Sequence, residues 1–144
     1  MNESDIQKVF VIDDDKSDLE IIERFFKKSR KNVDLFLFSD GAEALNQIYS
    51  GLIPKIIFLD INMPSKSGKE ILEEIRKNRV GSRMIVIMLS GSERESDILE
   101  CYDLGANSYL VKPYDLKSLY QQLEVTCSYW LDVSRLPSYT PRDF

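Results

Sequence analysis

The stretch VFVIDDDKSD, residues 9–18, joins a short apolar run directly to three consecutive acids. The residues from Val9 to Ile12 are β-branched or aromatic, which are the types that favour strands. The carboxylates of Asp13, Asp14 and Asp15 repel one another, and such repulsion raises pKa values or costs stability. The stretch therefore predicts a strand that delivers acids to a point where a positive group belongs.

Similar apolar runs recur along the chain, and several of them are apolar on both faces, as strands of a covered parallel sheet are. After the first run they cover Val33–Phe38, Lys55–Leu59, Met84–Leu89 and Ser108–Val111. Segments with a helical period of apolar residues separate or follow these runs. They cover Ser17–Ser29, Gly41–Tyr49, Ser67–Asn78, Ser92–Leu104 and Asp115–Val133. Five alternating strands and helices predict an α/β domain with a parallel sheet between helices.

The helical segments carry stripes of apolar residues that we expect to face the core. The stripes include Ile98, Leu99 and Tyr102 in the fourth segment and Leu116, Leu119 and Leu123 in the fifth. The first helix has two candidate caps, a capping box of Ser17 with Glu20 and an N-cap at Asp15. We expect one domain over residues 1–133 and a tail over residues 134–144, which contains two prolines and no period.

Composition narrows the classes of function. The chain has 144 residues, a net charge of −5, two cysteines and no histidine. The negative charge argues against nucleic acid as a partner, and the absence of histidine excludes histidine-based triads and zinc sites with histidine ligands. No apolar run approaches the ~20 residues of a membrane helix, and no signal peptide is evident, so we expect a cytoplasmic protein. Cys101 and Cys127 are expected to be reduced, packed thiols.

Polar groups follow four of the five predicted strands, at the edge where open α/β sheets bind ligands. Asp13 and Asp14 follow the first strand, Asp60 follows the third, Ser90 the fourth and Lys112 the fifth. Oxygen ligands of this kind suit a hard cation such as Mg²⁺, which also pairs with phosphoryl oxygens. A lysine and a hydroxyl suit the phosphoryl group itself, and an aspartate can carry it as an aspartyl-phosphate.

Four motifs, VIDDD, FLDINMPSKSG, MLSGS and YLVKP, resemble in order and spacing those of response-regulator receiver domains, from about Val9 to Gln122. The resemblance implies a flavodoxin-like doubly wound (βα)5 fold with a five-stranded parallel sheet in the order 2-1-3-4-5. It implies a phosphoacceptor in a histidine-to-aspartate phosphorelay, which assists its own phosphorylation and dephosphorylation and is not otherwise an enzyme.

The resemblance also assigns roles to individual residues. It implies that Asp60 accepts the phosphoryl group, that Lys112 and Ser90 contact it and that Tyr109 is the switch aromatic. The implied metal ligands for Mg²⁺ are Asp13, Asp14, Asp60 and the main-chain carbonyl of Asn62. Gly68 resembles the loop glycine after the acceptor strand, and the bond between Lys112 and Pro113 is expected to be cis.

The segments CYDLGANSYLVKP and WLDVSRLP are similar to those of single-domain regulators that partner bacterial phytochrome-type kinases. This second resemblance implies a sensor histidine kinase as partner and an output by protein contact or phosphate transfer. Tyr120, Cys127 and Trp130 add more apolar surface to the last helix than one core needs. We therefore expect a homodimer through the last helix and tail, with Trp130 as its anchor.

Two rival interpretations remain open at this point. DDDKS also fits the D-x-D-x-[TS] pattern of haloacid-dehalogenase-like Mg²⁺-dependent phosphohydrolases, with Asp13 as nucleophile and Asp15 as acid. The other rival is a binding module that keeps the fold and lacks the phosphoryl chemistry. The complete set of acids, hydroxyl and lysine favours the receiver.

Overall fold

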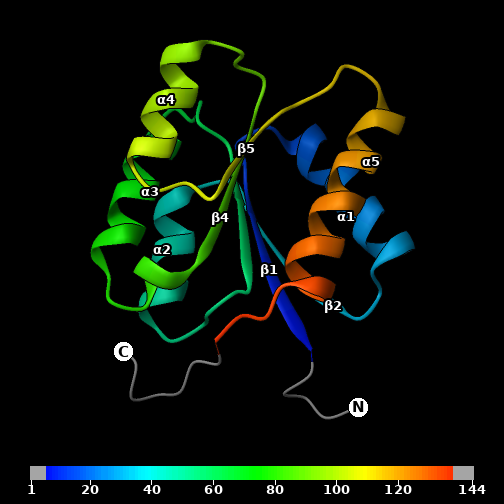
Figure 1. Ribbon diagram of the computed structural model, residues 1–144, viewed down its shortest axis with the longest axis horizontal. Helices are drawn as coiled ribbons and strands as arrows, with labels where there is room; N and C mark the ends of the chain where they lie inside the picture. Colours follow the sequence, from blue (N-terminus) through cyan, green and yellow to red (C-terminus); the bar gives the residue numbers. More distant parts are fainter. Residues whose placement is uncertain (1–5, 138–144) are drawn as a thin grey trace.

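The computed structural model describes residues 6–137. Over this range strands and helices alternate as the sequence predicts (Figure 1). The strands are β1 (Gln7–Ile12), β2 (Val33–Phe38), β3 (Ile56–Leu59), β4 (Ile85–Ser90) and β5 (Ser108–Val111). The helices are α1 (Lys16–Ser29), α2 (Gly41–Tyr49), α3 (Gly68–Lys77), α4 (Glu95–Asp103) and α5 (Leu116–Cys127), with a 3₁₀ turn η2 (Gly81–Arg83) and a π-helical turn η3 (Ser128–Val133).

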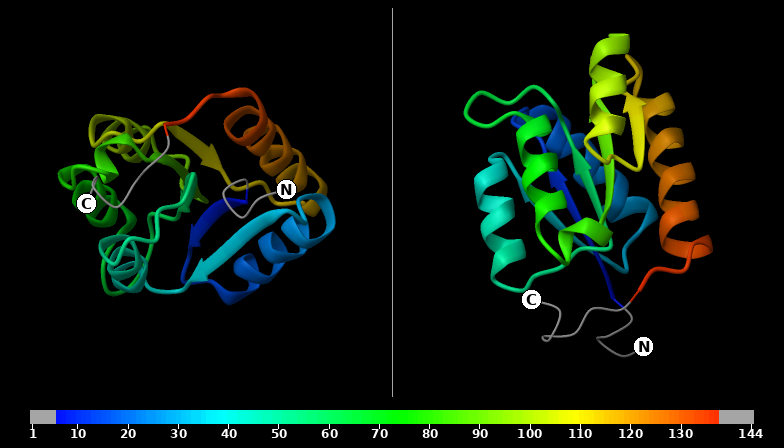
Figure 2. Two further views of the ribbon diagram at one scale, coloured as in Figure 1. Left: turned by 90° about the horizontal axis from the view of Figure 1, so that it is seen from below. Right: turned by 60° about the vertical axis from the view of Figure 1, so that its left-hand side comes forward.

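The five strands form one parallel sheet in the order β2-β1-β3-β4-β5. Helices α1 and α5 cover one face of the sheet, and α2, α3 and α4 cover the other (Figure 1; Figure 2, left). This arrangement confirms the predicted doubly wound fold and its strand order. It also places the carboxyl ends of β1, β3, β4 and β5 along one edge, where the predicted polar groups follow.

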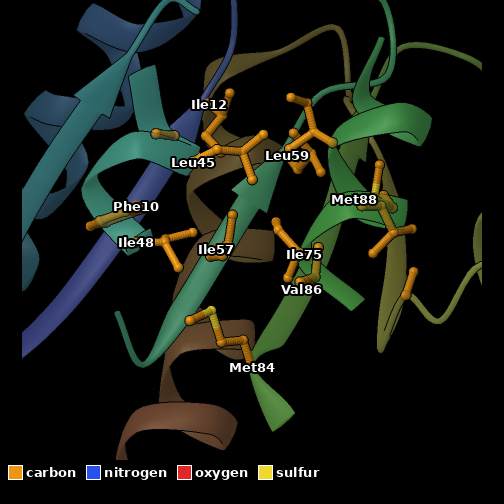
Figure 3. Packing of buried hydrophobic residues seen from close by; sticks show 14 of the residues in the cluster. Phe10, Ile12, Leu45, Ile48, Ile57, Leu59, Ile75, Met84, Val86 and Met88 are labelled. Atoms are coloured by element: carbon orange, nitrogen blue, oxygen red, sulfur yellow. The ribbon is translucent and has the colours of Figure 1, made fainter. Parts of the chain in front are cut away.

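Alternate residues of the central strands feed two cores, one on each face of the sheet. Ile57 and Leu59 of β3 pack with α2 and α3 (Figure 3), whereas Ile56 and Phe58 point to the side of α1 and α5. All four β3 residues are buried. Burial on both faces explains why the central strands are apolar without alternation.

The structure confirms Asp15, one of the two predicted caps, as the N-cap of α1, and it corrects the start of α4. The N-cap of α1 is Asp15, whose carboxylate accepts from the backbone N–H groups of Ser17 and Asp18, so Ser17 lies inside the helix and is not its cap. Helix α4 begins at Glu95 and not at Ser92. The Ser92 hydroxyl instead donates to Asp97 at 2.5 Å and accepts from the Arg94 N–H at 3.3 Å, which fixes a loop ahead of the helix.

Part of the predicted core is exposed. Leu99 and Tyr102 of α4 are 61% and 46% exposed, and Leu116 of α5 is 52% exposed. The expectation that these residues line the core was therefore wrong for these three positions. The reason is the position of β5 at the edge of the sheet, where its residues are only half-buried and offer neighbouring helices less to cover.

Helix α5 continues into η3 and packs more of its apolar residues than the sequence suggests. Cys127 is fully buried, the Tyr120 ring meets Phe25 edge-on at 5.5 Å, and half-buried Trp130 packs against the same cluster. These side chains contribute to the core, and the predicted role of the half-buried Trp130 as a dimer anchor stays a prediction. Cys101 and Cys127 are free, buried thiols, as expected, and burial raises the pKa of each.

None of the helices in residues 6–137 combines the length and the apolar character that crossing a membrane requires.

Candidate functional site

The sheet register brings the predicted acids together. Ile12 of β1 pairs with Leu59 of β3, so the residues that follow them, Asp13 and Asp60, leave the sheet at the same level. The Asp60 N–H donates to the Ile12 carbonyl at 3.0 Å and extends the ladder by one bond. The Asp13 N–H likewise donates to the Phe38 carbonyl at 3.0 Å, so backbone hydrogen bonds hold both residues at the carboxyl edge of the sheet.

The carboxylates of Asp13, Asp14 and Asp60 form a compact acidic cluster, in which one oxygen of each lies within 4.8 Å of the others. Asp13 and Asp60 are buried, with exposed fractions of 2% and 7%, whereas Asp14 is exposed. Burial raises the pKa of Asp13 to about 6, against the lowering effect of Lys112. Burial also raises the pKa of Asp60, although Lys112 and backbone N–H groups favour its charged form. The cluster therefore holds more negative charge than its surroundings stabilise.

Lys112 supplies the positive group that the sequence calls for. Its Nζ donates to Asp13 Oδ2 at 2.6 Å and to Asp18 Oδ2 at 2.9 Å, and lies 3.7 Å from Asp60 Oδ2. Burial alone would lower the pKa of Lys112, but the bonds to Asp13 and Asp18 outweigh it and raise the pKa. The ammonium therefore stays charged between the buried acids.

Asp18 is the one contact of Lys112 that sequence reasoning missed. It lies in the first turn of α1 and is separated from Lys112 by 94 positions in the chain. An acid at that place in a helix has an ordinary explanation, because it complements the helix dipole. Nothing local to the sequence distinguishes that role from an ion pair with a residue of another strand end.

Ser90 and Tyr109 lie on the two strands that follow β3 in the sheet, Ser90 at the end of β4 and Tyr109 in β5. Ser90 is fully buried, and its Oγ accepts from the Ser92 N–H at 3.2 Å. The Tyr109 hydroxyl donates to the Ser92 carbonyl at 2.8 Å, and burial raises the pKa of Tyr109. The loop between β4 and α4 thus connects the serine at one strand end with the tyrosine of β5.

The loop between β3 and α3 closes tightly over the acceptor strand. The Gly68 N–H donates to the Ile61 carbonyl at 2.8 Å, and a Cβ on Gly68 would lie 2.0 Å from the Asp60 carbonyl oxygen. Only glycine fits at this approach. Asn62 lies exposed in the same loop; its predicted role as a carbonyl ligand stays a prediction.

One expectation about the backbone was wrong. The described residues contain no cis peptide bond, so the bond between Lys112 and Pro113 is trans. Lys112 nevertheless points into the acidic cluster, where its bonds to Asp13 and Asp18 hold it.

An open cleft of about 710 Å³ flanks the site between the β3–α3 and β4–α4 loops. Its lining comprises Ile61, Asn62, Met63, Ser67, Lys69, Gly91, Ser92, Glu93, Arg94 and Asp97. Across the cleft, Lys69 Nζ pairs with Asp97 at 2.7 Å and with Glu100 at 2.7 Å, which ties α3 to α4.

The arrangement fits a divalent cation and a phosphoryl group. Clustered carboxylate oxygens are the ligands that Mg²⁺ and Mn²⁺ prefer, and a cation among them would offset the repulsion between buried charges. The geometry does not favour the phosphohydrolase alternative. Its acid would be Asp15, which is exposed and engaged as the N-cap of α1 by bonds of 2.9 and 3.2 Å.

Comparison with known proteins agrees with this geometry. Residues 9–124 match the response regulator receiver domain family. The response regulator Rcp1 of Synechocystis sp. is 32% identical over 136 residues, which cover 90% of this chain and 92% of Rcp1.

Two solved structures are similar over nearly the whole chain. The phosphorylated cyanobacterial phytochrome response regulator RcpA has a TM-score of 0.84 and 34% identity, and the match covers 92% of this chain and 99% of RcpA. The Mn²⁺-bound form of Rcp1 has a TM-score of 0.82 and 33% identity, with the same coverage of 92% and 99%.

Proposed function

The chain belongs to the response regulator receiver domain family, and on this premise we propose that Asp60 is the residue that accepts the phosphoryl group. A receiver is the phosphoacceptor of a two-component pathway. Membership of the family does not by itself say which side chains of this chain accept and bind the phosphoryl group. The observation that carries the proposal is the position of Lys112 Nζ, which lies 3.7 Å from Asp60 Oδ2 inside the acidic cluster.

In the proposed reaction an Asp60 carboxylate oxygen forms a bond to the phosphorus of a phosphohistidine on a partner kinase. The P–N bond of the donor breaks at the same time, and the histidine nitrogen leaves with the electron pair of that bond. The product is an acyl phosphate on Asp60. With acetyl phosphate as donor, a P–O bond breaks instead and acetate leaves.

Asp13, Asp14 and Asp60 would hold the divalent cation, together with the Asn62 carbonyl, and we infer that this cation is Mg²⁺. When bound, it neutralises charge on the phosphoryl oxygens. The fit rests on three carboxylate oxygens within 4.8 Å of one another. Rcp1, a relative of 33% identity, is known in a Mn²⁺-bound form.

Lys112 and Ser90 would bind the phosphoryl oxygens through charge-assisted and neutral hydrogen bonds. The Ser90 Oγ now accepts a hydrogen bond from the Ser92 N–H, and this bond would change when Ser90 binds a phosphoryl oxygen. The carbonyl of the same Ser92 accepts from the Tyr109 hydroxyl. We propose that Tyr109 reports the state of Ser90 through this loop. The exposed residues of α4 and α5, Leu99, Tyr102 and Leu116, lie on the surface that would change shape.

We further propose a sensor histidine kinase of the phytochrome type as the donor, because Rcp1 and RcpA are relatives and RcpA is a phytochrome response regulator. Transfer from such a kinase would place the protein in the cytoplasm. We propose that the chain assists its own phosphorylation and dephosphorylation and does not turn over other substrates.

We propose a homodimer through the last helix and tail, in which exposed apolar residues lie beside the predicted anchor Trp130. Val125, Tyr129 and Val133 are 70%, 52% and 72% exposed along α5 and η3, whereas Trp130 is half-buried. Residues 138–144 of the predicted tail lie outside the described residues. Sedimentation velocity with and without phosphodonor tests the dimer, and Val125→Glu should shift it toward monomer; a wild-type monomer under both conditions would contradict the proposal.

The experiment for the central proposal is intact-mass measurement after incubation with acetyl phosphate and Mg²⁺. The wild-type chain should gain one phosphoryl group, and borohydride reduction followed by peptide mapping should mark Asp60. Asp60→Asn, folded by circular dichroism, should gain none. Label on Asp13, or many turnovers of a phosphatase substrate, would favour the hydrolase; no gain with any donor would favour the binding module.

A further inference from the structure

The Lys112 ammonium has a neighbour that the proposed chemistry does not use. Asp18 Oδ2 accepts from Lys112 Nζ at 2.9 Å, and the two side chains are 31% and 19% exposed. Asp18 is the third residue of α1, in the turn that follows the first strand end. A partly buried ion pair between a helix and the end of β5 requires an explanation beyond surface solvation.

The capping roles of an acid at this place are taken by other residues. In a capping box, the third helical residue would accept from the backbone N–H of the N-cap. Here the N–H of Asp15, the N-cap, donates to Asp13 Oδ1 at 2.9 Å instead. The helix end is also capped by the Asp15 carboxylate itself. The Asp18 carboxylate is therefore left available for Lys112.

An ammonium has three N–H donors on a flexible four-carbon chain, so its direction must be set by its partners. Asp13 at 2.6 Å and Asp18 at 2.9 Å take two of these donors. Asp60 Oδ2, at 3.7 Å, lies just beyond hydrogen-bonding distance. We propose that Asp18 is a positioning residue that fixes Lys112 so that its third N–H faces Asp60 and the phosphoryl group placed there.

Asp13 cannot fulfil this role alone. Its carboxylate also belongs to the cluster of three that would hold the cation, and Asp18 does not belong to that cluster. A carboxylate shared with a divalent cation attracts a nearby ammonium less strongly. Asp18 therefore anchors Lys112 in the same way whether or not the cation is bound. This inference rests on the proposed role of Asp60.

The test compares rates of phosphorylation by acetyl phosphate, followed by intact mass. Asp18→Ala removes one charge-assisted hydrogen bond and should slow the reaction roughly tenfold. Asp18→Asn keeps an acceptor oxygen at the same place, so it should recover part of that loss. Glu20→Ala is the matched control, because Glu20 is an exposed acid on the same helix, and it should react at the wild-type rate.

A double-mutant cycle separates positioning from a purely structural role. In a Lys112→Met background the residual rate should not fall further when Asp18→Ala is added, because the group that Asp18 positions is absent. An equal loss in both backgrounds would show that Asp18 acts only on the stability of α1 and would overturn the inference. The side-chain ¹⁵N signal of the Lys112 ammonium, recorded without phosphodonor, should be protected from exchange in the wild type and lost in Asp18→Ala.

The two proposals fail in distinguishable ways. If Asp60 is phosphorylated equally fast in the wild type and in Asp18→Ala, the inference is wrong and the function of Asp60 stands. If the wild-type chain is not phosphorylated on Asp60 at all, the proposed function is wrong, and the role of Asp18 in that reaction is wrong with it.

Discussion

The molecule contains two clusters in which acidic side chains surround one basic side chain, and the two clusters differ in burial. At the carboxyl edge of the sheet, Lys112 lies among Asp13, Asp18 and Asp60. At the C-terminal end of α1, Arg30 Nη1 donates to both carboxylate oxygens of Asp132 in η3 at 2.9 Å, and Nη2 donates to Glu124 in α5 at 3.2 Å. Each cluster surrounds one cation with acids, yet their surroundings differ.

The acids of the Arg30 cluster are half-exposed to water, whereas two of the three acids around Lys112, Asp13 and Asp60, are buried. The side chains of Asp132 and Glu124 are 52% and 50% exposed, and bonding to Asp132 raises the pKa of Arg30. The side chains of Asp13 and Asp60 are 3% and 8% exposed, and burial raises their pKa values. Half-exposed acids paired with the largely buried Arg30 connect η3 to α1, whereas buried, incompletely paired acids are available to bind a cation and a phosphoryl group.

The largest effect should come from the backbone beneath the acidic cluster. Gly68→Ala places a Cβ 2.0 Å from the Asp60 carbonyl oxygen, and the clash should lower the free energy of unfolding by about 3 kcal/mol. Urea denaturation measures it. Gly91→Ala is the control, because nothing lies within 4 Å of a Cβ built there. An equal, small loss for both variants would contradict the close packing of the β3–α3 loop.

The next effect is a gain in stability from removing a buried acid. Because burial raises the pKa of Asp13 to about 6, the folded chain binds a proton more tightly than the unfolded chain does. Ionisation therefore costs stability increasingly as the pH rises from about 4 to above 6. In cation-free buffer at pH 7, Asp13→Asn should raise the free energy of unfolding by about 2 kcal/mol.

The gain should shrink toward zero as the pH falls below the ordinary Asp pKa of 3.8, where Asp13 becomes protonated in the unfolded chain as well as in the folded chain. The exposed acid Asp34 offers the matched variant, Asp34→Asn, which should change little at either pH. A loss of stability in Asp13→Asn at pH 7 would mean that the pairing of Asp13 with Lys112 outweighs its burial.

Divalent cation should recover what the buried acids cost. At tenfold excess over the dissociation constant, Mg²⁺ should stabilise the wild-type chain by about 1.4 kcal/mol in thermal or urea unfolding. Its affinity, measured by calorimetry, should be higher at pH 7 than at pH 5, because protons on Asp13 and Asp60 compete with the cation below their raised pKa values. Asp13→Asn should remove both effects, and equal affinity at the two pH values would contradict the proposed ligands.

The smallest effect should come from the second cluster. Arg30→Met should lower the free energy of unfolding by about 1 kcal/mol, because its acid partners remain solvated when the arginine is lost. Hydrogen exchange should become faster in η3, because the ion pair of Arg30 with Asp132 is lost. The Gln7 side chain, which donates to the Leu131 carbonyl at 2.7 Å, would still hold η3 in part. Arg24→Met, on the exposed side of α1, is the control. Slower phosphorylation in Arg30→Met would show that the two clusters are coupled.

The sequence predicted the fold because its signals are local. The site residues at the strand ends follow apolar runs directly in the sequence, as Asp13 follows Ile12 and Asp60 follows Leu59. In a parallel sheet such residues gather at one edge whatever the detailed register. Helix starts were less certain, since Asp15 and Ser17 are both good caps and only the bonds made by Asp15 decided between them.

What the tertiary structure alone decided are the contacts between distant parts of the chain. Asp18 with Lys112 and Arg30 with Asp132 span 94 and 102 positions, and the same residues would suit solvent-exposed helix ends equally well. The tertiary structure likewise decided that Trp130 packs against the core while Leu99 is exposed to water. The physical reason is that a local pattern fixes backbone conformation and which face of an element is apolar, whereas the partner of a charge, and so its pKa, depends on which elements the fold places beside it.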